Sequence, residues 1–576
     1  MITAVGAALR FWRLDQQSPW LDEVGTAYRV TGSFNELLQT LSNQGFGPLW
    51  FALLWLWARL IEILTGNGAL AFSPGMLRIL PAAAGTAMIP AMYLAARFFA
   101  PLSTPRRALL VAMFIAINPY SIYYSRDLKM YGLLWTLLTL HVGLLLAFHS
   151  RRSAWLYSLA TLSLTLAAFT QGVAWLIAPL GITIALTRPR ARWFDLPLQL
   201  LMFAIAGVAP LLWMQFGTHF YQDFVVRPDT GGLNWIAVNW SINAVTLCNT
   251  PAVYLVGSCI AQWPVPPETT RYFLLGADFS FSGPIAIACG VALTLFLLPL
   301  LTGLLPERML PRQRRLANPD QRMVSLASYG RRWWLYVWAI VPLALVALVS
   351  LPRENPLSLW PHYMVYQHRY VAAAFPAFVM WFALGLINLP NFKWFPIRTV
   401  MIVIAASVCL ASSLSNHLTY RLPPYLHMAK LAKPYWDKQH PESMMMIHSR
   451  ATSCVASDLY AYATEFGYRP HIISRRSSDN VDPEIPLIRP YQVSDNLNEW
   501  ARILHSVRYR NNLTTVVVSD RLADTNQLSD EMVQQQMGPE WQEVLEDHYR
   551  LRYEWNLHLS HHYRTRIYKK VIQTQR

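Results

Sequence analysis

The sequence predicts a polytopic α-helical membrane protein that ends in a small α/β domain outside the cytoplasm. Of its 576 residues, 54% are hydrophobic and only 14% are charged. Several apolar stretches approach or exceed the ~18 to 20 residues with which a helix crosses a bilayer. After Asn416 the chain becomes polar and charged. We therefore divide it into a membrane domain at 1–416 and a soluble domain at 417–576.

Apolar segments define the predicted membrane domain. They lie at residues 1–12, 47–64, 76–100, 107–118, 131–149, 153–187, 196–215, 282–305, 333–351, 370–388 and 397–416. Segment 153–187 is long enough for two passes, with a break at Thr170-Gln171-Gly172. The stretch 242–261 is apolar enough to dip into the bilayer, but its asparagines and Pro251 favour a re-entrant or surface helix.

Two of these segments are not predicted to be complete spans. Segment 1–12 is too short to cross at ~1.5 Å per residue, so we expect that the start codon is misplaced or that an upstream part of the helix is missing. Segment 47–64 carries Arg59 and Glu62, and we interpret it as an amphipathic helix in the interface. About eleven spans result.

The formal net charge of +16 fits membrane topology better than a nucleic-acid partner, because the basic residues form short clusters between apolar segments. The clusters are Arg97 with Arg106 and Arg107; Arg151 and Arg152; Arg188, Arg190 and Arg192; the arginine-rich 307–332; and Lys393 with Arg398. All of these basic clusters face the cytoplasm if segment 47–64 does not cross the membrane. We therefore expect an integral protein of a bacterial inner membrane, with the C-terminal domain on the non-cytoplasmic side. The outer loops would be 15–75, 118–130, 216–281 and 352–369.

The C-terminal domain is predicted from alternating patterns. Short β-like runs at 444–449, 471–474 and 514–520 alternate with helical-looking stretches such as 457–467. The five cysteines show neither a CxxC pair nor His/Cys ligand spacing, so neither a zinc site nor a disulfide framework is indicated. A bond between Cys248 and Cys259 stays open if their loop faces an oxidising compartment.

An acidic pair stands at the outer end of the first apolar segment. In SPWLDEVGTAYRV, residues 18–30, Asp22 and Glu23 are adjacent, and a carboxylate left in hydrocarbon would cost several kcal/mol. One interpretation is a functional site at the membrane surface. The alternative is that both side chains lie in water or cap the helix VGTAYRV, since acids favour helix N-termini.

Two further polar clusters emerge on the same predicted face. INPYSIYYSRDLKMYG, residues 117–132, places Arg126 and Lys129 three residues apart, a helical spacing that suits a phosphate. HYMVYQHRY, residues 362–370, brings a basic and aromatic group: His362, His368, Arg369 and Tyr370. For both clusters the alternative is an interfacial belt of snorkelling side chains, and this alternative is favoured for residues 362–370.

The order of several motifs resembles a known family. SPWLDE precedes the amphipathic GPLWFALLWLWARL, then LRILPAAAGTAMIPAMYLAARFF, then NPYSIYYSRDLKMYGLL. This series is similar to the polyprenyl-phosphate-dependent glycosyltransferases related to dolichyl-phosphate-mannose protein mannosyltransferases and the bacterial aminoarabinose transferase. It covers residues 10–150, and HRYVAAAFPAF at 368–378 more loosely. The resemblance implies a C-type glycosyltransferase-like membrane fold with Asp22 as the catalytic base and Glu23 beside it.

The same resemblance assigns roles to residues in the 117–132 cluster, and this chain departs from the family pattern at two points. An SxExRMY-like pattern maps onto Ser125, Asp127, Lys129, Met130 and Tyr131. Lys129 stands where arginine is usual, which keeps the charge but loses the bidentate fork. Relatives carry His-Pro-Pro before the amphipathic helix, whereas this chain has Gly47-Pro48. A metal site built on that histidine is therefore not implied, no cofactor is assigned, and a divalent metal ion stays open.

The chemistry of these residues fits sugar transfer from a polyprenyl-phosphate donor to a lipid, glycan or protein acceptor. Asp22 would activate the acceptor as a base, and cations would stabilise the charge that develops on the leaving phosphate. A single base predicts direct displacement with inversion. The phosphate-binding residues would be Arg126, Lys129 and Arg369, supported by Asp127, Tyr131, His368 and Tyr370.

Two other classes of protein remain alternatives. A transporter or flippase of a lipid-linked glycan would also carry charges at span ends, but it should place ionisable groups near the midplane, where these segments have almost none. A non-catalytic membrane receptor is the other alternative. Neither the sugar nor the acceptor is identified by the sequence.

Overall fold

The computed structural model forms two compact units, which we describe separately. The described residues are 1–17, 19, 21–44, 47–187, 192–216, 244–256, 296–304, 319–349, 371–389, 396–418, 431, 433–435, 444–448, 515–521, 535–537, 539, 541–552 and 560–570. The first unit contains Met1–Trp12, Gly32–Trp57 and Arg78–His417. The second contains Arg13–Thr31, Ala58–Leu77 and Leu418–Arg576.

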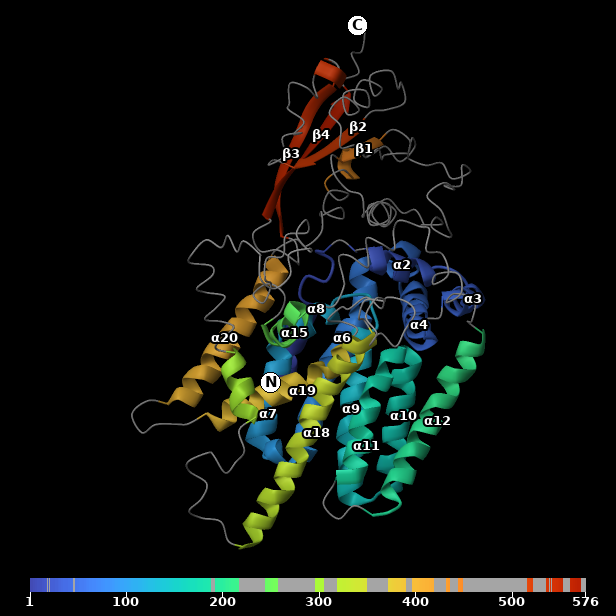
Figure 1. Ribbon diagram of the computed structural model, residues 1–576. Coiled ribbons are helices and arrows are strands. Elements are labelled where there is room, and N and C mark those ends of the chain that lie inside the picture. Colours follow the sequence, from blue (N-terminus) through green and yellow to red (C-terminus); the bar gives the residue numbers. More distant parts are fainter. Residues whose placement is uncertain are drawn as a thin grey trace. The chain divides into compact units, whose positions relative to one another are not determined.

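The first unit is a bundle of helices (Figure 1). Its elements are α1 (Ile2–Phe11), α3 (Phe34–Gln44), the start of α4 (Pro48–Thr65), most of α6 (Pro74–Phe98), η1 (Ala100–Leu102), α7 (Pro105–Ile117), α8 (Pro119–Ser125), α9 (Tyr131–Arg151), α10 (Ala154–Thr170), η2 (Gly172–Ile177), α11 (Ala178–Thr187), α12 (Asp195–Phe216), α15 (Ala244–Val256), a helix at 296–304, α18 (Pro319–Val349), η4 (Ala372–Ala374), α19 (Phe375–Asn388) and α20 (Ile397–Leu418). Helix α10 packs between α9 and α12, and α11 packs on α12 and α18.

Several of these helices are long and apolar enough to cross a membrane. Within the described residues they are α4, α6, α9, α12 and α20, while α7 and α8 pass the same test together as a pair bent by 55°. The chain is therefore an integral membrane protein, and the number of about eleven spans stays a prediction. Helix α4 qualifies by length and composition, so its predicted place in the interface also stays a prediction. The break expected in 153–187 is present, because α10 ends before Gln171.

Two glycines let helix α6 approach α8 and α9 closely. A Cβ on Gly85 of α6 would lie 1.9 Å from Oγ of Ser125, and a Cβ on Gly132 of α9 would lie 3.1 Å from the carbonyl oxygen of Pro81. Helix α6 therefore packs on both elements through its own backbone. Ser125 is buried, with 1% of its surface exposed.

We expect Gly85→Ala to lower the thermal midpoint of the purified protein, because the added methyl group must displace Ser125. Overpacking of this kind costs about 1 to 3 kcal/mol. Gly207→Ala in α12 is the matched control, since its Cβ would meet its nearest neighbour at 3.5 Å, an ordinary contact. An equal loss of stability in both variants would contradict the close approach at Gly85.

The second unit contains α2 (Leu21–Arg29), α5 (Gly68–Ala71), η5 (Lys433–Tyr435) and a four-stranded sheet. The strands are β1 (Met444–His448), β2 (Thr515–Arg521), β3 (Trp541–Arg552) and β4 (Ser560–Lys570), in the order β1-β2-β4-β3. Strands β1 and β2 are parallel, whereas β2–β4 and β3–β4 are antiparallel. Figure 1 shows β3 and β4 as the longest strands.

The sequence located only part of this sheet. The runs at 444–449 and 514–520 correspond to β1 and β2, and the parallel pairing requires a crossover connection, as in α/β folds. The predicted strand 471–474 and helix 457–467 lie outside the described residues. The β3–β4 hairpin was missed because β3, WQEVLEDHYRLR, carries so many charged residues that no hydrophobic alternation stands out.

Candidate functional site

Arg126 and Lys129, the cations of the 117–132 cluster, follow a sharp bend between α7 and α8. Pro119 is the first residue of α8 and has no N–H to continue the ladder of α7. Asn118 caps the new helix, its Oδ1 accepting from the backbone N–H of Ser121 at 2.7 Å. Because the two helices diverge by 55°, the last carbonyl groups of α7 must find partners elsewhere.

Arg10 of α1 supplies partners for this bend, and sequence reasoning did not single it out. The side chain is fully buried. Its guanidinium donates to the carbonyl oxygens of Gly6, Ile115 and Ala116 at 2.9, 2.9 and 3.0 Å, and to the hydroxyls of Ser121 and Ser125 at 2.9 and 3.3 Å. The signal that could have identified Arg10 in the sequence is a charged residue inside an apolar segment.

Helix α15 is held in the same region by side chains from α8 and α20. Nδ2 of Asn118 donates to the carbonyl oxygens of Tyr254 and Leu255 at 2.8 and 3.4 Å. Ser412 donates to the carbonyl oxygen of Val256 at 2.7 Å. Carbonyl oxygens of the last three described residues of α15 thus accept side-chain hydrogen bonds. Helix α15 is described over 13 residues, and its predicted re-entrant or surface character stays a prediction.

The loop between α8 and α9 carries the predicted phosphate-binding cations. Lys129 is only 7% exposed and Asp127 only 5%. Trp50, near the start of α4, donates its indole N–H to the carbonyl oxygen of Leu128 at 3.0 Å. A snorkelling belt residue extends its charged end into water. The burial of Lys129 therefore differs from what the belt interpretation predicts.

Arg126 is held at the end of α20. Its Nη1 donates to Nδ1 of His417 at 2.6 Å, and the His417 ring lies 5.1 Å from the Trp12 ring. Because arginine has no acceptor, the imidazole accepts and carries its proton on Nε2. Arg126 thus fixes the start of the loop against α20, a contact that its predicted role in binding phosphate did not anticipate.

Tyr131 belongs to an aromatic cluster beneath the loop. Its ring lies 5.1 Å from Tyr124 and 6.0 Å from Trp135. Tyr120 stacks on Trp135 at 5.3 Å and meets Phe375 at 5.2 Å. Such contacts favour one packing arrangement of the rings. Tyr131 is 3% exposed and packs at the start of α9, and its supporting role in a phosphate site stays a prediction.

The acidic pair lies in the first turn of α2, in the second unit. The helix begins at Leu21, three residues earlier than VGTAYRV predicts, so Asp22 and Glu23 are helical residues and not N-caps. Acidic side chains there complement the positive end of the helix dipole. Glu23 is 2% exposed, so it does not lie in water. The approach of Asp22 to Lys129 stays a prediction.

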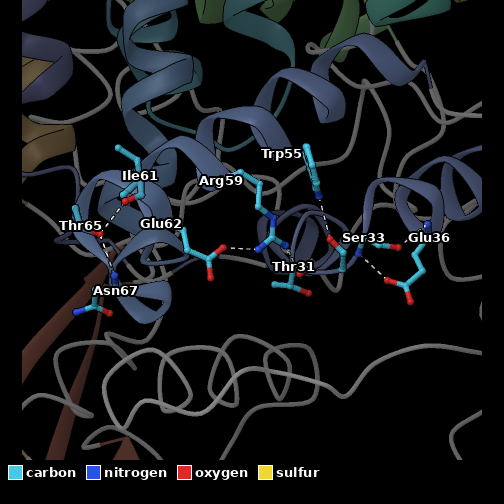
Figure 2. A network of polar contacts seen from close by, with 10 residues as sticks. Thr31, Ser33, Glu36, Trp55, Arg59, Ile61, Glu62, Thr65 and Asn67 are labelled. Carbon is cyan, nitrogen blue, oxygen red and sulfur yellow. Dashed lines mark hydrogen bonds and ion pairs between the residues drawn. The ribbon is translucent and has the colours of Figure 1, made fainter.

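Helix α4 anchors the chain that follows α2 (Figure 2). Trp55 donates its indole N–H to the carbonyl oxygen of Gly32 at 2.9 Å, and one turn later Arg59 donates to the carbonyl oxygen of Thr31 at 2.6 Å. Arg59 is also paired with Glu62. The two charges that defined α4 as amphipathic therefore bind each other and the end of the α2 segment.

Helix α3 starts with a capping box, also visible in Figure 2. The backbone N–H of Ser33 donates to Oε2 of Glu36 at 2.7 Å, and the backbone N–H of Glu36 donates to Oγ of Ser33 at 3.3 Å. Hydrogen bonds from the backbone and the side chain of Ser33 lower the pKa of the Glu36 carboxyl. The start of α3 is thus fixed by two reciprocal hydrogen bonds.

Gly47 explains the missing histidine in terms of packing. A Cβ there would lie 2.5 and 2.6 Å from the carbonyl oxygens of Phe169 and Thr170, so a side chain does not fit. In the described part of the chain, no group of three or more His, Cys, Asp or Glu side chains could hold a metal ion. Several sequence-predicted residues lie outside the described residues: His362, His368, Arg369, Tyr370 and Cys259.

Comparisons with known proteins were made for the sequence and the fold. No family model and no curated protein matches the sequence. Similar solved structures include the oligosaccharyltransferase AglB from Archaeoglobus fulgidus in complex with an inhibitory peptide and a dolichol-phosphate, at 12% identity and a TM-score of 0.44, covering 90% of this chain and 68% of that one. ArnT from Cupriavidus metallidurans bound to undecaprenyl phosphate is similar at 12% identity and a TM-score of 0.37, covering 100% and 98%. These two neighbours were solved with a polyprenyl phosphate, dolichol-phosphate in AglB and undecaprenyl phosphate in ArnT.

Proposed function

We propose that this chain is a membrane glycosyltransferase that moves a sugar from a polyprenyl-phosphate donor to a lipid, glycan or protein acceptor, with inversion at the anomeric carbon. One observation carries the proposal. A short loop at a span end keeps the charged residues Asp127 and Lys129 buried and is braced by Trp50 and by His417 through Arg126. The burial of Lys129 distinguishes it from a snorkelling belt residue, whose charged end reaches water, and supports a cation placed at a span end for a lipid-held phosphate.

The proposed chemistry divides the labour between two segments. Lys129 stabilises the negative charge that develops on the leaving phosphate, and as a flexible point charge it needs no bidentate geometry. Asp22 removes the proton from the attacking hydroxyl or amine of the acceptor. Glu23, which is almost fully buried, is the adjacent alternative base. Arg369 keeps its predicted role in binding the phosphate, and His368 and Tyr370 keep their predicted supporting roles.

The proposed place of reaction is the outer membrane surface. A donor held by its polyprenyl tail presents its phosphate at the level where the spans end, which is where α8 gives way to the loop of Lys129. The tail would lie in the apolar layer, near the tryptophan-rich α4. Basic residues cluster at the opposite ends of α6, α9 and α12, in agreement with a cytoplasmic location for those ends.

The direct test is the release of free polyprenyl phosphate by the purified protein in lipid nanodiscs. The donor is a polyprenyl-phosphate sugar labelled in its lipid, and a membrane extract supplies the acceptor. We expect labelled polyprenyl phosphate to accumulate with time and protein concentration. A protein that moves the intact donor across vesicle membranes without releasing polyprenyl phosphate would be a flippase. Binding of the donor with neither result would indicate a receptor.

The orientation can be checked by labelling with an impermeant thiol reagent. We expect Arg314→Cys, in the basic stretch 307–332, to be protected in spheroplasts, because basic loops stay in the cytoplasm. Gln542→Cys, on an exposed position of β3, should react. The unmodified chain supplies the background from the five native cysteines. The reverse pattern would place the loop of Lys129 on the cytoplasmic side and contradict the proposed reaction there.

A further inference from the structure

Arg10 is a buried cation whose charge is balanced by dipoles. A guanidinium has five N–H donors, and the contacts of Arg10 use a matching number of oxygens, three carbonyls and two hydroxyls. Among the described residues, no acidic side chain pairs with it. Ile115 and Ala116 lie in the last turn of α7, the negative end of its dipole. Arg10 therefore has no donor left for a ligand.

The same side chain fixes α8 relative to α7. Ser121 and Ser125 are four residues apart and so lie on one face of α8, toward Arg10. Ser125 also donates to the carbonyl oxygen of Ser121 at 2.6 Å and packs against Gly85. One guanidinium thus joins the end of α7 to the whole length of α8 across a 55° bend.

Ser125 is the last residue of α8, and the loop with Arg126 and Lys129 follows directly. A rotation of α8 about the bend would therefore move this loop. Other braces hold the loop farther along, at Leu128 through Trp50 and at Arg126 through His417. Arg10 acts before the loop, on α8 itself, by joining that helix to the end of α7.

We propose that Arg10 is a positioning residue that places Lys129 for the donor phosphate without touching the donor itself. The expected effect of Arg10 on donor use rests on the proposed function. Its expected effect on the position of the loop that carries Lys129 does not. The planar fork matters as much as the charge, because a lysine ammonium has three donors on one atom and cannot replace all five contacts of the guanidinium.

The test compares Arg10→Lys with Ser413→Ala. Ser413 donates to the carbonyl oxygen of Ile117 at 2.8 Å, so this control also removes a side-chain bond from the end of α7 but leaves α8 untouched. The first readout needs no activity: each change is combined with Lys129→Cys, and the rate of thiol modification is measured. We expect Arg10→Lys to raise that rate about tenfold, through easier local opening, and Ser413→Ala to leave it nearly unchanged. Equal rates in both variants would overturn the proposal.

The second readout is a double-mutant cycle on kcat/KM for the donor. Arg10→Lys should lower kcat/KM by about tenfold with Lys129 present and have little further effect in Lys129→Met, because both changes remove the same contact. A merely structural role would lower the folded yield and give equal fold-losses in both backgrounds, which would overturn the catalytic part. If the wild-type protein releases no polyprenyl phosphate, the proposed function fails, and the thiol rates alone decide the role of Arg10.

A milder variant guards against an Arg10→Lys protein that does not fold. Ser121→Ala leaves Arg10 in place and removes one of its two contacts with α8. We expect a smaller rise in the modification rate of Lys129→Cys, in the same direction. An unchanged rate would show that the hydroxyl contact does not hold the loop.

Discussion

Asp22→Asn is expected to slow sugar transfer by about 10²-fold or more, while donor binding is largely kept. The change preserves the shape of the side chain and replaces its proton-accepting carboxylate with an amide. A carboxamide in the first turn of α2 remains compatible with the helix. The measurement is the rate of polyprenyl-phosphate release at saturating donor, with donor binding followed separately on the same preparation.

Glu23→Gln is the matched variant for this experiment. Both acids lie in the first turn of one helix, so each substitution removes one charge from the same end of the helix dipole. If Asp22 is the base, only Asp22→Asn should lose turnover per folded molecule. Transfer at the wild-type rate in Asp22→Asn would exclude Asp22, and loss of turnover in Glu23→Gln would then identify Glu23 as the base.

Lys129→Met should weaken use of the donor by about 1.5 to 3 kcal/mol, which is roughly ten- to more than a hundredfold in kcat/KM. Methionine keeps an unbranched apolar stem and removes only the charge. Because Lys129 is 7% exposed, a contact between its ammonium and the phosphate would form in a poorly hydrated place, where it is strong. Donor-concentration kinetics, normalised to folded protein, measure the effect.

Lys129→Arg supplies the control for charge. It keeps the cation at this position, and the family that the motifs resemble usually has arginine there, so much of the activity should remain. A belt residue would behave differently: Lys129→Met would slightly lower stability or membrane yield and leave the kinetics per folded molecule unchanged. Unchanged kinetics would remove Lys129 from the proposed site.

Local patterns were sufficient for the elements that one segment determines by itself. Hydropathy located the apolar helices, the break near Gln171 and the strands β1 and β2, because span length and alternation are properties of consecutive residues. The predicted start of α2 was wrong by three residues, since leucine at position 21 gives no capping signal. The β3–β4 hairpin was missed, because a strand rich in charge is specified by its pairing and not by its hydrophobic pattern.

The sequence by itself determined a membrane protein with an acidic pair before α4 and a run of cations after Asn118-Pro119. Only the tertiary structure decided what surrounds those cations. The contact of Arg10 with the carbonyl oxygen of Ile115 joins residues 105 apart, and that of Arg126 with His417 joins residues 291 apart. No local pattern encodes such partners, because a buried polar group is satisfied by whatever acceptor the packing brings to it.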